Sequence, residues 1–239
     1  MKEAMAESRA AYGQPSLLAL HDLLLAEYGP RGWWPGDGPF DVIIGAILTQ
    51  AASWKNVELA LANLKAAHCW SFQAIAALPQ ETLAEIIRPS GYFNAKAAKL
   101  KAFAAHLLEG YEGDLDRMFS KDTALLRREL LSIHGIGPET ADDILVYAAG
   151  KPSFVIDTYT IRIMERLGIV PENGSNRYGD WQEMFHNQLP PNVALFNEFH
   201  ALLDHHAGGV CRKTPVCEGC CLLSVCPTGQ ELEKARMVC

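Results

Sequence analysis

Residues 130–145, LLSIHGIGPETADDIL, join one helical pattern to the next through two glycines that stand one residue apart. Glycine adopts positive φ without steric cost and lets another backbone approach, so Gly135 and Gly137 predict a tight turn. Pro138 pre-sets the first helical turn and has no N–H group to leave unsatisfied. The second helix therefore begins with free N–H groups, which suit an anion such as phosphate. For a Gly-x-Gly pair alone, an ordinary corner between two helices is the simpler interpretation.

Most of the remaining chain reads in helical period, which predicts an all-α fold. Pro39 can occupy the first turn of one helix, and Ser53 can cap the next. The apolar residues 153–156, SFVI, are too few to seed a sheet, so we expect a buried connector. Further helices are predicted at residues 79–87, 94–111, 121–133, 137–150, 157–169, 180–189 and 192–209.

Composition limits the class of protein without deciding it. The 239 residues are 49% hydrophobic, enough for a proper core, and carry a net charge of -7. That charge argues against a generally basic nucleic-acid coat but allows a local basic face. The longest apolar runs are too short to span a bilayer, and residues 1–13 lack the regions of a signal peptide. We expect a soluble, monomeric, cytoplasmic protein that does not bind membranes, associated with the nucleoid if bacterial.

Five of the seven cysteines lie within residues 211–226, which in an intracellular chain indicates metal binding rather than disulfides. Cys211, Cys217, Cys220 and Cys226 form a Cys-x5-Cys-x2-Cys-x5-Cys pattern, with Cys221 left over. Zinc and a [4Fe–4S] cluster both accept four thiolates, and spacing alone leaves the two comparable.

The stretch at 130–145, followed by SFVIDTYTIRIMERLGI at 153–169, resembles the endonuclease III family of helix-hairpin-helix DNA glycosylases. The similarity runs from about residue 38 to residue 226. It implies two helical lobes with a cleft between them: a central helical-barrel domain at 38–150, and a lobe made of 1–37 plus 151–239. It also implies that the amides of Gly135, Ile136 and Gly137 hold a backbone phosphate of double-stranded DNA containing a damaged base.

The resemblance decides the cysteine loop in favour of a [4Fe–4S] cluster, because the family has nearly this pattern with one more residue in the first gap. The ligands would be Cys211, Cys217, Cys220 and Cys226, in a structural and DNA-docking role. In the family this loop presents basic side chains to DNA, here Arg212 and Lys213. The one-residue difference falls beside these two. Asp204, His205 and His206, just upstream, are interpreted as structural groups at a helix end.

Asp157 follows the apolar connector and can cap the helix at 157–169. The family has its essential aspartate at this position, where an ionised carboxylate stabilises the oxocarbenium-like charge formed when a base leaves deoxyribose, or orients the attacking water. Members with lyase activity carry a lysine at the position of Glu139, and a carboxylate cannot form a Schiff base. The sequence therefore favours a monofunctional glycosylase, with Lys151 as a weak substitute amine.

The position where adenine-excising relatives carry a general acid is Gly45 here. A cationic base such as 3-methyladenine is an activated leaving group that needs no acid, so we expect an alkylation-damage glycosylase like the type III 3-methyladenine branch. The alternatives are a mismatch uracil or thymine glycosylase, a glycosylase with lyase activity, and a DNA-damage-binding protein without turnover.

Gln50, in ILTQAAS at 47–53, matches the family glutamine that fills the duplex when a nucleotide is flipped out. A surface glutamine at a helix end is the alternative. Five aromatic residues are candidates to stack on the flipped base, although most aromatics are core residues: Trp33, Trp34, Trp54, Tyr92 and Phe93. Three lysines on the helix at 94–111 suit phosphate contact and simple solvation equally: Lys96, Lys99 and Lys101.

Overall fold

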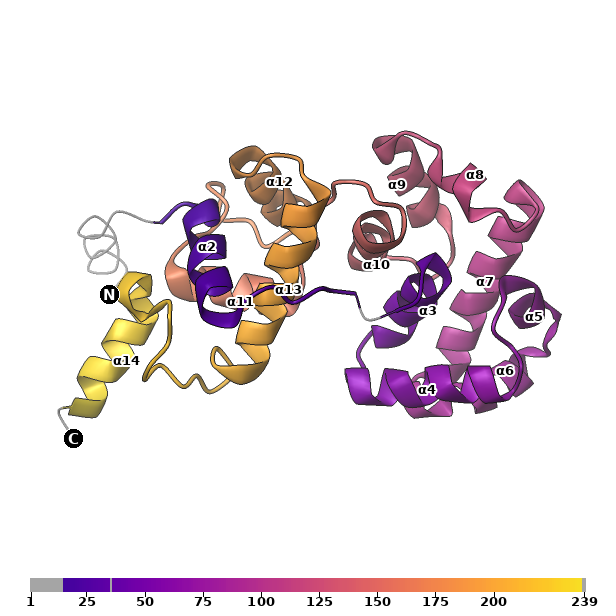
Figure 1. Ribbon diagram of the computed structural model, residues 1–239, viewed down its shortest axis with the longest axis horizontal. Coiled ribbons are helices and arrows are strands. Elements are labelled where there is room, and N and C mark those ends of the chain that lie inside the picture. Colours follow the sequence, from indigo (N-terminus) through magenta and orange to yellow (C-terminus); the bar gives the residue numbers. More distant parts are fainter. Residues whose placement is uncertain (1–14, 35, 238–239) are drawn as a thin grey trace. The chain divides into compact units, whose positions relative to one another are not determined.

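The computed structural model describes residues 15–34 and 36–237, so the expectation for residues 1–13 lies outside the described residues. The described residues form helices and loops without a strand, which confirms the all-α prediction (Figure 1). The elements are α2 (Leu17–Tyr28), α3 (Pro39–Thr49), α4 (Trp54–Ala66), α5 (Phe72–Ala77), α6 (Gln80–Ile86), η1 (Arg88–Ser90), α7 (Phe93–Tyr111), α8 (Leu115–Phe119), α9 (Thr123–Ser132), α10 (Pro138–Asp143), η2 (Ile144–Ala148), α11 (Thr158–Leu167), α12 (Tyr178–Gln188), α13 (Val193–Gly209), η3 (Leu223–Val225) and α14 (Pro227–Met237). No helix among them is both long and apolar enough to cross a membrane.

The chain forms two compact units, each described by itself below. One unit is Trp34–Ser153, and the other takes the chain up to Trp33 and from Phe154 onward. In the unit Trp34–Ser153, α3 packs against α4, α7, α10 and η2, while α7 packs against α5 and α6. Its core is apolar and includes the fully buried Ile47, Leu100 and Phe103.

Proline and glycine place two helix starts in this unit where the sequence predicts them. Pro39 begins α3 after Gly38, and Pro138 begins α10 after Gly137. Ser53 is the N-cap residue of α4, but its side chain makes no capping hydrogen bond. The helix predicted at 137–150 is instead α10 followed by a π-helical turn, η2, in which the Ala149 N–H reaches back to Ile144 O at 2.9 Å.

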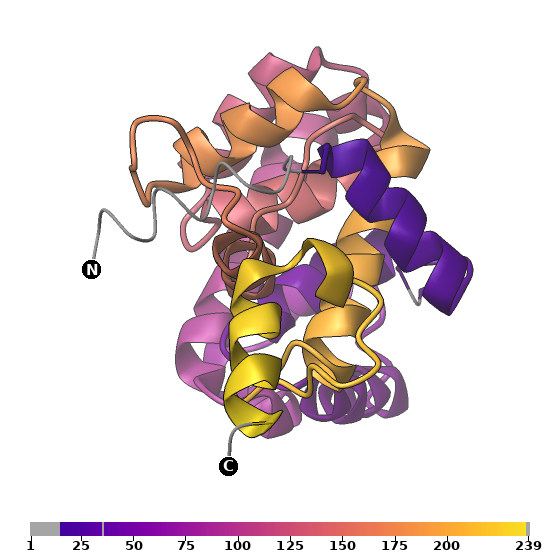
Figure 2. The same cartoon turned by 90° about the vertical axis from the view of Figure 1, so that its left-hand side faces the viewer.

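The buried connector that the sequence predicts at residues 153–156 lies mostly in the other unit, which begins again at Phe154. Phe154, Val155 and Ile156 are at most 1% exposed, and the Phe154 ring stacks on Phe185 with centroids 4.1 Å apart. The long helix α13 packs against both α2 and α11, as the two views show (Figures 1 and 2). This packing fixes the start of α11, which directly follows the connector.

Candidate functional site

The glycine turn between α9 and α10 has the backbone that only glycine adopts easily. Gly135 has φ +83°, and a Cβ built on it would lie 2.1 Å from Cγ of Lys99. The Ile136 N–H donates to Ile133 O at 3.1 Å, whereas the N–H groups of Gly135 and Gly137 have no partner among the described residues. Of the three amides that the sequence predicts for phosphate binding, two are therefore available and the Ile136 amide is engaged.

The predicted wedge residue, Gln50, is held against this turn. Its side-chain Nε2 donates to Gly135 O at 3.2 Å and to Oγ1 of Thr140 at 2.9 Å. Its Oε1 accepts a hydrogen bond from Nζ of Lys99. Gln50 caps the C-terminus of α3, so its amide links α3, α7 and α10. In this structure the side chain joins the elements of the turn, and entry into a duplex would require these bonds to break.

The three lysines of α7 differ from each other. Lys96 is 1% exposed and donates to the carbonyls of Leu48 and Ser90 at 2.8 and 2.6 Å, so neither phosphate contact nor solvation describes it. Its burial, and secondarily the charge of Lys99, lower the Lys96 pKa to about 8. Lys101 donates to two carbonyls at the end of α5. Only Lys99 is placed beside the glycine turn.

An aromatic cluster covers Gly45, the position that lacks a general acid. A Cβ on Gly45 would lie 2.9 Å from Cζ2 of Trp34. The Trp34 ring meets Trp54 edge-on with centroids 5.5 Å apart, and it meets Tyr147 at 5.4 Å and 49°. All three aromatic residues are half-buried. Tyr147 was not predicted, because the sequence offers only its place in a helical pattern.

Two of the other predicted aromatic residues, Tyr92 and Phe93, stand apart from this cluster. Tyr92 is 74% exposed at the start of α7, with φ +45°. The Phe93 ring lies under the Arg88 guanidinium, 4.6 Å from the ring centroid. Trp33 is half-buried and belongs to the unit that contains Asp157. Within the unit Trp34–Ser153, the structure therefore brings together two of the four predicted aromatic residues, Trp34 and Trp54.

Asp157 caps α11 as predicted, since its Oδ1 accepts the Thr160 N–H at 2.7 Å. Its Oδ2 lies 4.0 Å from Nε2 of His200 on α13, and the two side chains are only 16% and 11% exposed. Asp204, one helical turn beyond His200, is also near: burial raises the pKa of Asp204, and the charge of Asp157 adds to that shift. The predicted catalytic carboxylate thus lies in a small, mostly buried polar group.

The two residues considered for lyase chemistry occupy ordinary positions. Glu139 is exposed in the first turn of α10, where a carboxylate is favoured by the helix dipole. Lys151 is half-buried, and its backbone N–H donates to the Leu145 carbonyl at 2.8 Å just after η2.

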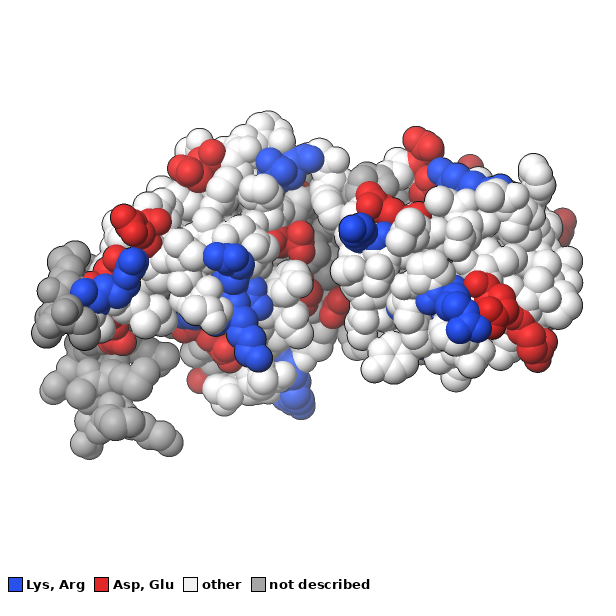
Figure 3. Space-filling model, turned by 90° about the horizontal axis from the view of Figure 1, so that it is seen from below, with Lys and Arg blue, Asp and Glu red and all other residues white. Residues whose placement is uncertain are grey.

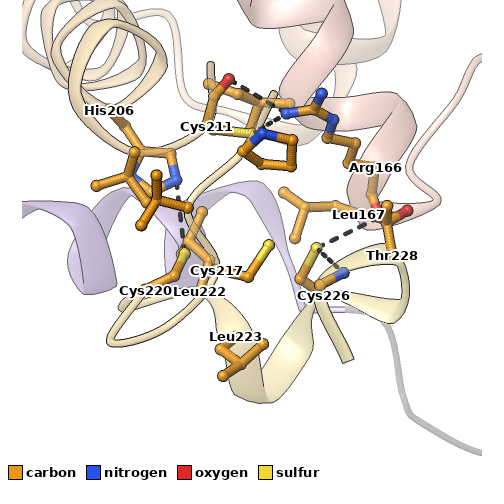
Figure 4. Close-up of a pocket in the computed structure, with 15 residues that line it drawn as sticks. Arg166, Leu167, His206, Cys211, Cys217, Cys220, Leu222, Leu223, Cys226 and Thr228 are labelled. Atoms are coloured by element: carbon orange, nitrogen blue, oxygen red, sulfur yellow. Dashed lines mark hydrogen bonds between the residues drawn. The ribbon is translucent and has the colours of Figure 1, made fainter. Parts of the chain in front are cut away.

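The four predicted cysteine ligands line one cavity of about 20 Å³, between the end of α13 and the start of α14 (Figure 4). Two N–H groups point at their sulfurs: Arg166 Nη1 lies 3.1 Å from Sγ of Cys211, and the Gly229 N–H lies 3.3 Å from Sγ of Cys226. A Cβ on Gly229 would lie 3.4 Å from Sγ of Cys226 and 3.6 Å from Sγ of Cys217, so glycine leaves these sulfurs room.

Cys220 differs from the other cysteines in its environment. A hydrogen bond with the Cys221 thiol lowers the pKa of Cys220, against the opposing effect of burial. His206 Nε2 lies 3.8 Å from the Cys220 sulfur, and its Nδ1 is 2.7 Å from the Tyr28 hydroxyl. His206 therefore links α2 to the cysteine loop, in agreement with the structural role predicted for it.

Arg166 also fixes the backbone of the segment that carries Arg212 and Lys213. Its guanidinium donates to Arg212 O at 2.8 Å and to Lys213 O at 3.0 Å, and Arg162 donates to Cys211 O at 3.0 Å. The side chains of Arg212 and Lys213 are exposed. On the face drawn in Figure 3, basic and acidic residues are intermixed in small groups, so a local contact suits this surface better than a broad basic one.

A glycine turn that presents amides at a helix start, and an aspartate that caps the helix after a buried connector, together define a helix-hairpin-helix protein. The sequence pattern of the HhH-GPD superfamily of base excision DNA repair proteins matches residues 44–188. A candidate DNA repair glycosylase of Methanocaldococcus jannaschii is 42% identical over 209 residues, which cover 87% of this chain and 94% of that protein. An endonuclease III of Sulfolobus acidocaldarius is 30% identical over 78% of this chain and 81% of its own length.

Among solved structures, the H. pylori 3-methyladenine DNA glycosylase bound to 1,N6-ethenoadenine superposes with a TM-score of 0.68. It is 29% identical, and the match covers 80% of this chain and 95% of that one. An endonuclease III in a non-covalent DNA complex gives a TM-score of 0.77 at 21% identity, over 90% of this chain and 95% of that one, which shows the shared fold. This chain belongs to the HhH-GPD superfamily of base excision DNA repair proteins. The resemblance predicted from the sequence is confirmed, and the chain is of the DNA glycosylase type.

Proposed function

We propose that this protein is a monofunctional DNA N-glycosylase that hydrolyses the bond between deoxyribose and an alkylated purine such as 3-methyladenine. Double-stranded DNA containing the damaged base is its partner, and Asp157 is its catalytic carboxylate. The substrate class is that named for the 29% identical H. pylori relative. The protein would act as a monomer.

The single observation that carries this substrate is the aromatic cluster over Gly45. Trp34 occupies the space that a side chain at position 45 would need, so no carboxylic acid can stand there without displacing the indole. A neutral adenine needs a proton to leave, whereas a cationic base does not. The faces of Trp34, Trp54 and Tyr147 attract cations, and they attract an electron-poor base more strongly than a neutral one. The lack of an acid at position 45 and the presence of the three aromatic rings therefore both favour cationic bases as substrates.

In the proposed reaction, the electron pair of the C1′–N bond leaves with the base, which becomes neutral. Positive charge develops on the sugar, and the ionised Asp157 carboxylate stabilises it. The oxygen of a water molecule then bonds to C1′, and its proton passes to Asp157 and on to solvent. An amine nucleophile is not required, in keeping with the carboxylate of Glu139 where lyase-competent relatives carry lysine.

The free backbone amides of Gly135 and Gly137 would bind phosphates of the DNA backbone, together with the side chains of Arg212 and Lys213. Backbone amides bind phosphate without reading sequence, which suits an enzyme that must find damage in any context. The Gln50 side chain would leave the turn and fill the gap in the duplex when the base is flipped out.

The cysteine loop would hold a [4Fe–4S] cluster through Cys211, Cys217, Cys220 and Cys226, and the cluster would stiffen the loop that carries the basic residues. Four cysteine sulfurs line one cavity, and both zinc and a [4Fe–4S] cluster accept such a ligand set. The resemblance to the endonuclease III family is what favours the cluster. N–H groups aimed at two of the sulfurs, from Arg166 and Gly229, are the hydrogen bonds that tune such centres.

Iron and acid-labile sulfide analysis of protein purified without oxygen tests the cofactor. We expect equal amounts of both, retained in Cys221→Ser and lost in Cys217→Ser. Zinc in place of iron, or iron loss in Cys221→Ser alone, would contradict the assignment.

The substrate is tested by chromatography of bases released from methylated duplex DNA, from uracil opposite guanine and from thymine opposite guanine. We expect 3-methyladenine release, reduced in Trp34→Leu, while Tyr92→Leu serves as the control outside the cluster. Release of uracil or thymine alone would support the mismatch alternative. DNA binding without release of any base would support the non-catalytic one.

A further inference from the structure

His200 is a polar residue that the proposed reaction does not yet use, and it faces Asp157 within one compact unit. Its Nε2 is 4.0 Å from Asp157 Oδ2, and its side chain is 11% exposed. The other carboxylate oxygen, Oδ1, is already bound by the Thr160 N–H. The imidazole therefore lies next to Oδ2, the oxygen of Asp157 that does not take part in the helix cap.

The relative position of the two side chains is fixed by well-packed elements. Asp157 directly follows the buried connector, whose Phe154 ring lies edge-on to the His200 ring with centroids 6.5 Å apart. Phe154 in turn packs against Phe196 and Phe199 of α13, at 5.4 and 5.7 Å. The helices α11 and α13 also pack directly on each other. Only a side-chain shift of about 1 Å separates the 4.0 Å contact from a hydrogen bond.

We propose that His200 is a positioning residue, which donates from Nε2–H to Asp157 Oδ2 and so holds the carboxylate in one rotamer when the substrate is bound. The inference rests on the proposed function, in which Asp157 is the catalytic group. A carboxylate held at both oxygens cannot rotate away from the developing charge, and small misplacements of a catalytic group are costly to rate.

The neutral imidazole is the form that suits this role. Protonation at Nε2 alone gives a donor toward Asp157 without adding a positive charge beside the sugar, where the reaction itself develops one. The titratable groups that act on the same small site are Asp157 at the start of α11, and Asp204 and His205 on α13. The further charged or titratable groups on these two helices are Tyr159, Arg162, Glu165, Arg166, Glu198 and His206. The second carboxyl, Asp204, stands on the same helix one turn away, and in its ionised form it only accepts hydrogen bonds, so it does not compete with His200 as a donor.

Two substitutions separate positioning from packing. His200→Gln keeps an N–H donor at nearly the same reach, while His200→Met keeps the volume without a donor. The exposed His205, changed to Met, is the matched control on the same helix. We would measure single-turnover base release with protein in excess over methylated duplex. Affinity would be measured with a duplex carrying a tetrahydrofuran abasic analogue.

For His200→Met we expect release slowed about ten- to hundredfold with affinity changed less than about twofold, and for His200→Gln release within about threefold of the wild type. The control should match the wild type. Equal loss in the Gln and Met variants, no loss in either, or parallel loss of affinity would each overturn the proposal.

A measurement without turnover separates this inference from the proposed function. Imidazole ¹⁵N NMR should show His200 protonated at Nε2, with a resonance that shifts in Asp157→Asn while that of His205 does not. If the wild type releases no base, the proposed function fails and this spectrum decides the contact alone. A His200 signal that ignores Asp157→Asn would overturn the proposal.

Discussion

Replacing Gly135 by alanine should destabilise the protein through two separable causes. The first is the backbone: φ is +83° here, and an L-residue pays about 1–2 kcal/mol to adopt the left-handed region. The second is steric: the new Cβ would lie 2.1, 2.6 and 2.9 Å from Cγ, Cδ and Cε of Lys99, so the whole stem must move. Overpacking of this kind costs about 1–3 kcal/mol. The expected loss in free energy of unfolding is therefore about 2–5 kcal/mol.

Urea unfolding followed by circular dichroism measures this loss, and Gly137→Ala is the matched control. Gly137 has φ -89° and a Cβ there would meet nothing within 4 Å, so only the modest cost of alanine at an N-cap, at most about 1 kcal/mol, is expected. In a Lys99→Ala background the steric cause disappears, and Gly135→Ala should cost only the backbone part, about 1–2 kcal/mol. Two results would contradict these causes: equal losses of unfolding free energy for Gly135→Ala and Gly137→Ala, or the same loss for Gly135→Ala in the Lys99→Ala background as in the wild type.

Three further predictions concern residues of the unit Trp34–Ser153. The Arg127 guanidinium donates to the carboxylate of the fully buried Asp142 at 2.8 and 2.9 Å. Because Arg127→Met leaves this buried charge unpaired, it should lower the free energy of unfolding by about 3 kcal/mol. A loss below about 1 kcal/mol would contradict this. The Lys96 pKa is about 8 in the folded protein and ordinarily 10.5, so between these pH values the unfolded chain binds the Lys96 proton more tightly than the folded protein does. The free energy of unfolding of the wild type should therefore rise with pH across this window, relative to that of Lys96→Met. A difference between the two proteins that does not change with pH would contradict this. Glu139→Lys should gain a borohydride-trapped adduct with abasic DNA, absent in the wild type and in Glu139→Gln, whereas trapping by the wild type would show that another amine serves.

Helix starts could be predicted from the sequence because cap chemistry is decided within a few residues. Pro39, Pro138 and Asp157 each stand where the local pattern places them, and Asp157 caps its helix as predicted, by accepting the N–H of Thr160. The π-helical turn at Ile144–Ala148 was missed, since nothing in a periodic apolar pattern distinguishes it from a continued α-helix. The terminal helices α2 and α14 were also missed.

The partners of site residues could not be predicted, because they come from distant parts of the chain. Gln50 bonds to a carbonyl 85 residues away, and Lys96 reaches a carbonyl 48 residues away. The contact of Trp34 with Gly45 depends on how the segment before α3 folds back, which no short pattern encodes. His200 likewise reads in the sequence as one more polar residue of a helix, and only packing brings it to Asp157.

The most direct test of the account is the release of free bases from methylated duplex DNA by the wild type and by Asp157→Asn, separated by chromatography. The account predicts 3-methyladenine from the wild type, little or none from Asp157→Asn, and similar DNA affinity for both. Release by Asp157→Asn at the wild-type rate would remove the aspartate from the mechanism, and release of no alkylated base by the wild type would contradict the proposed substrate.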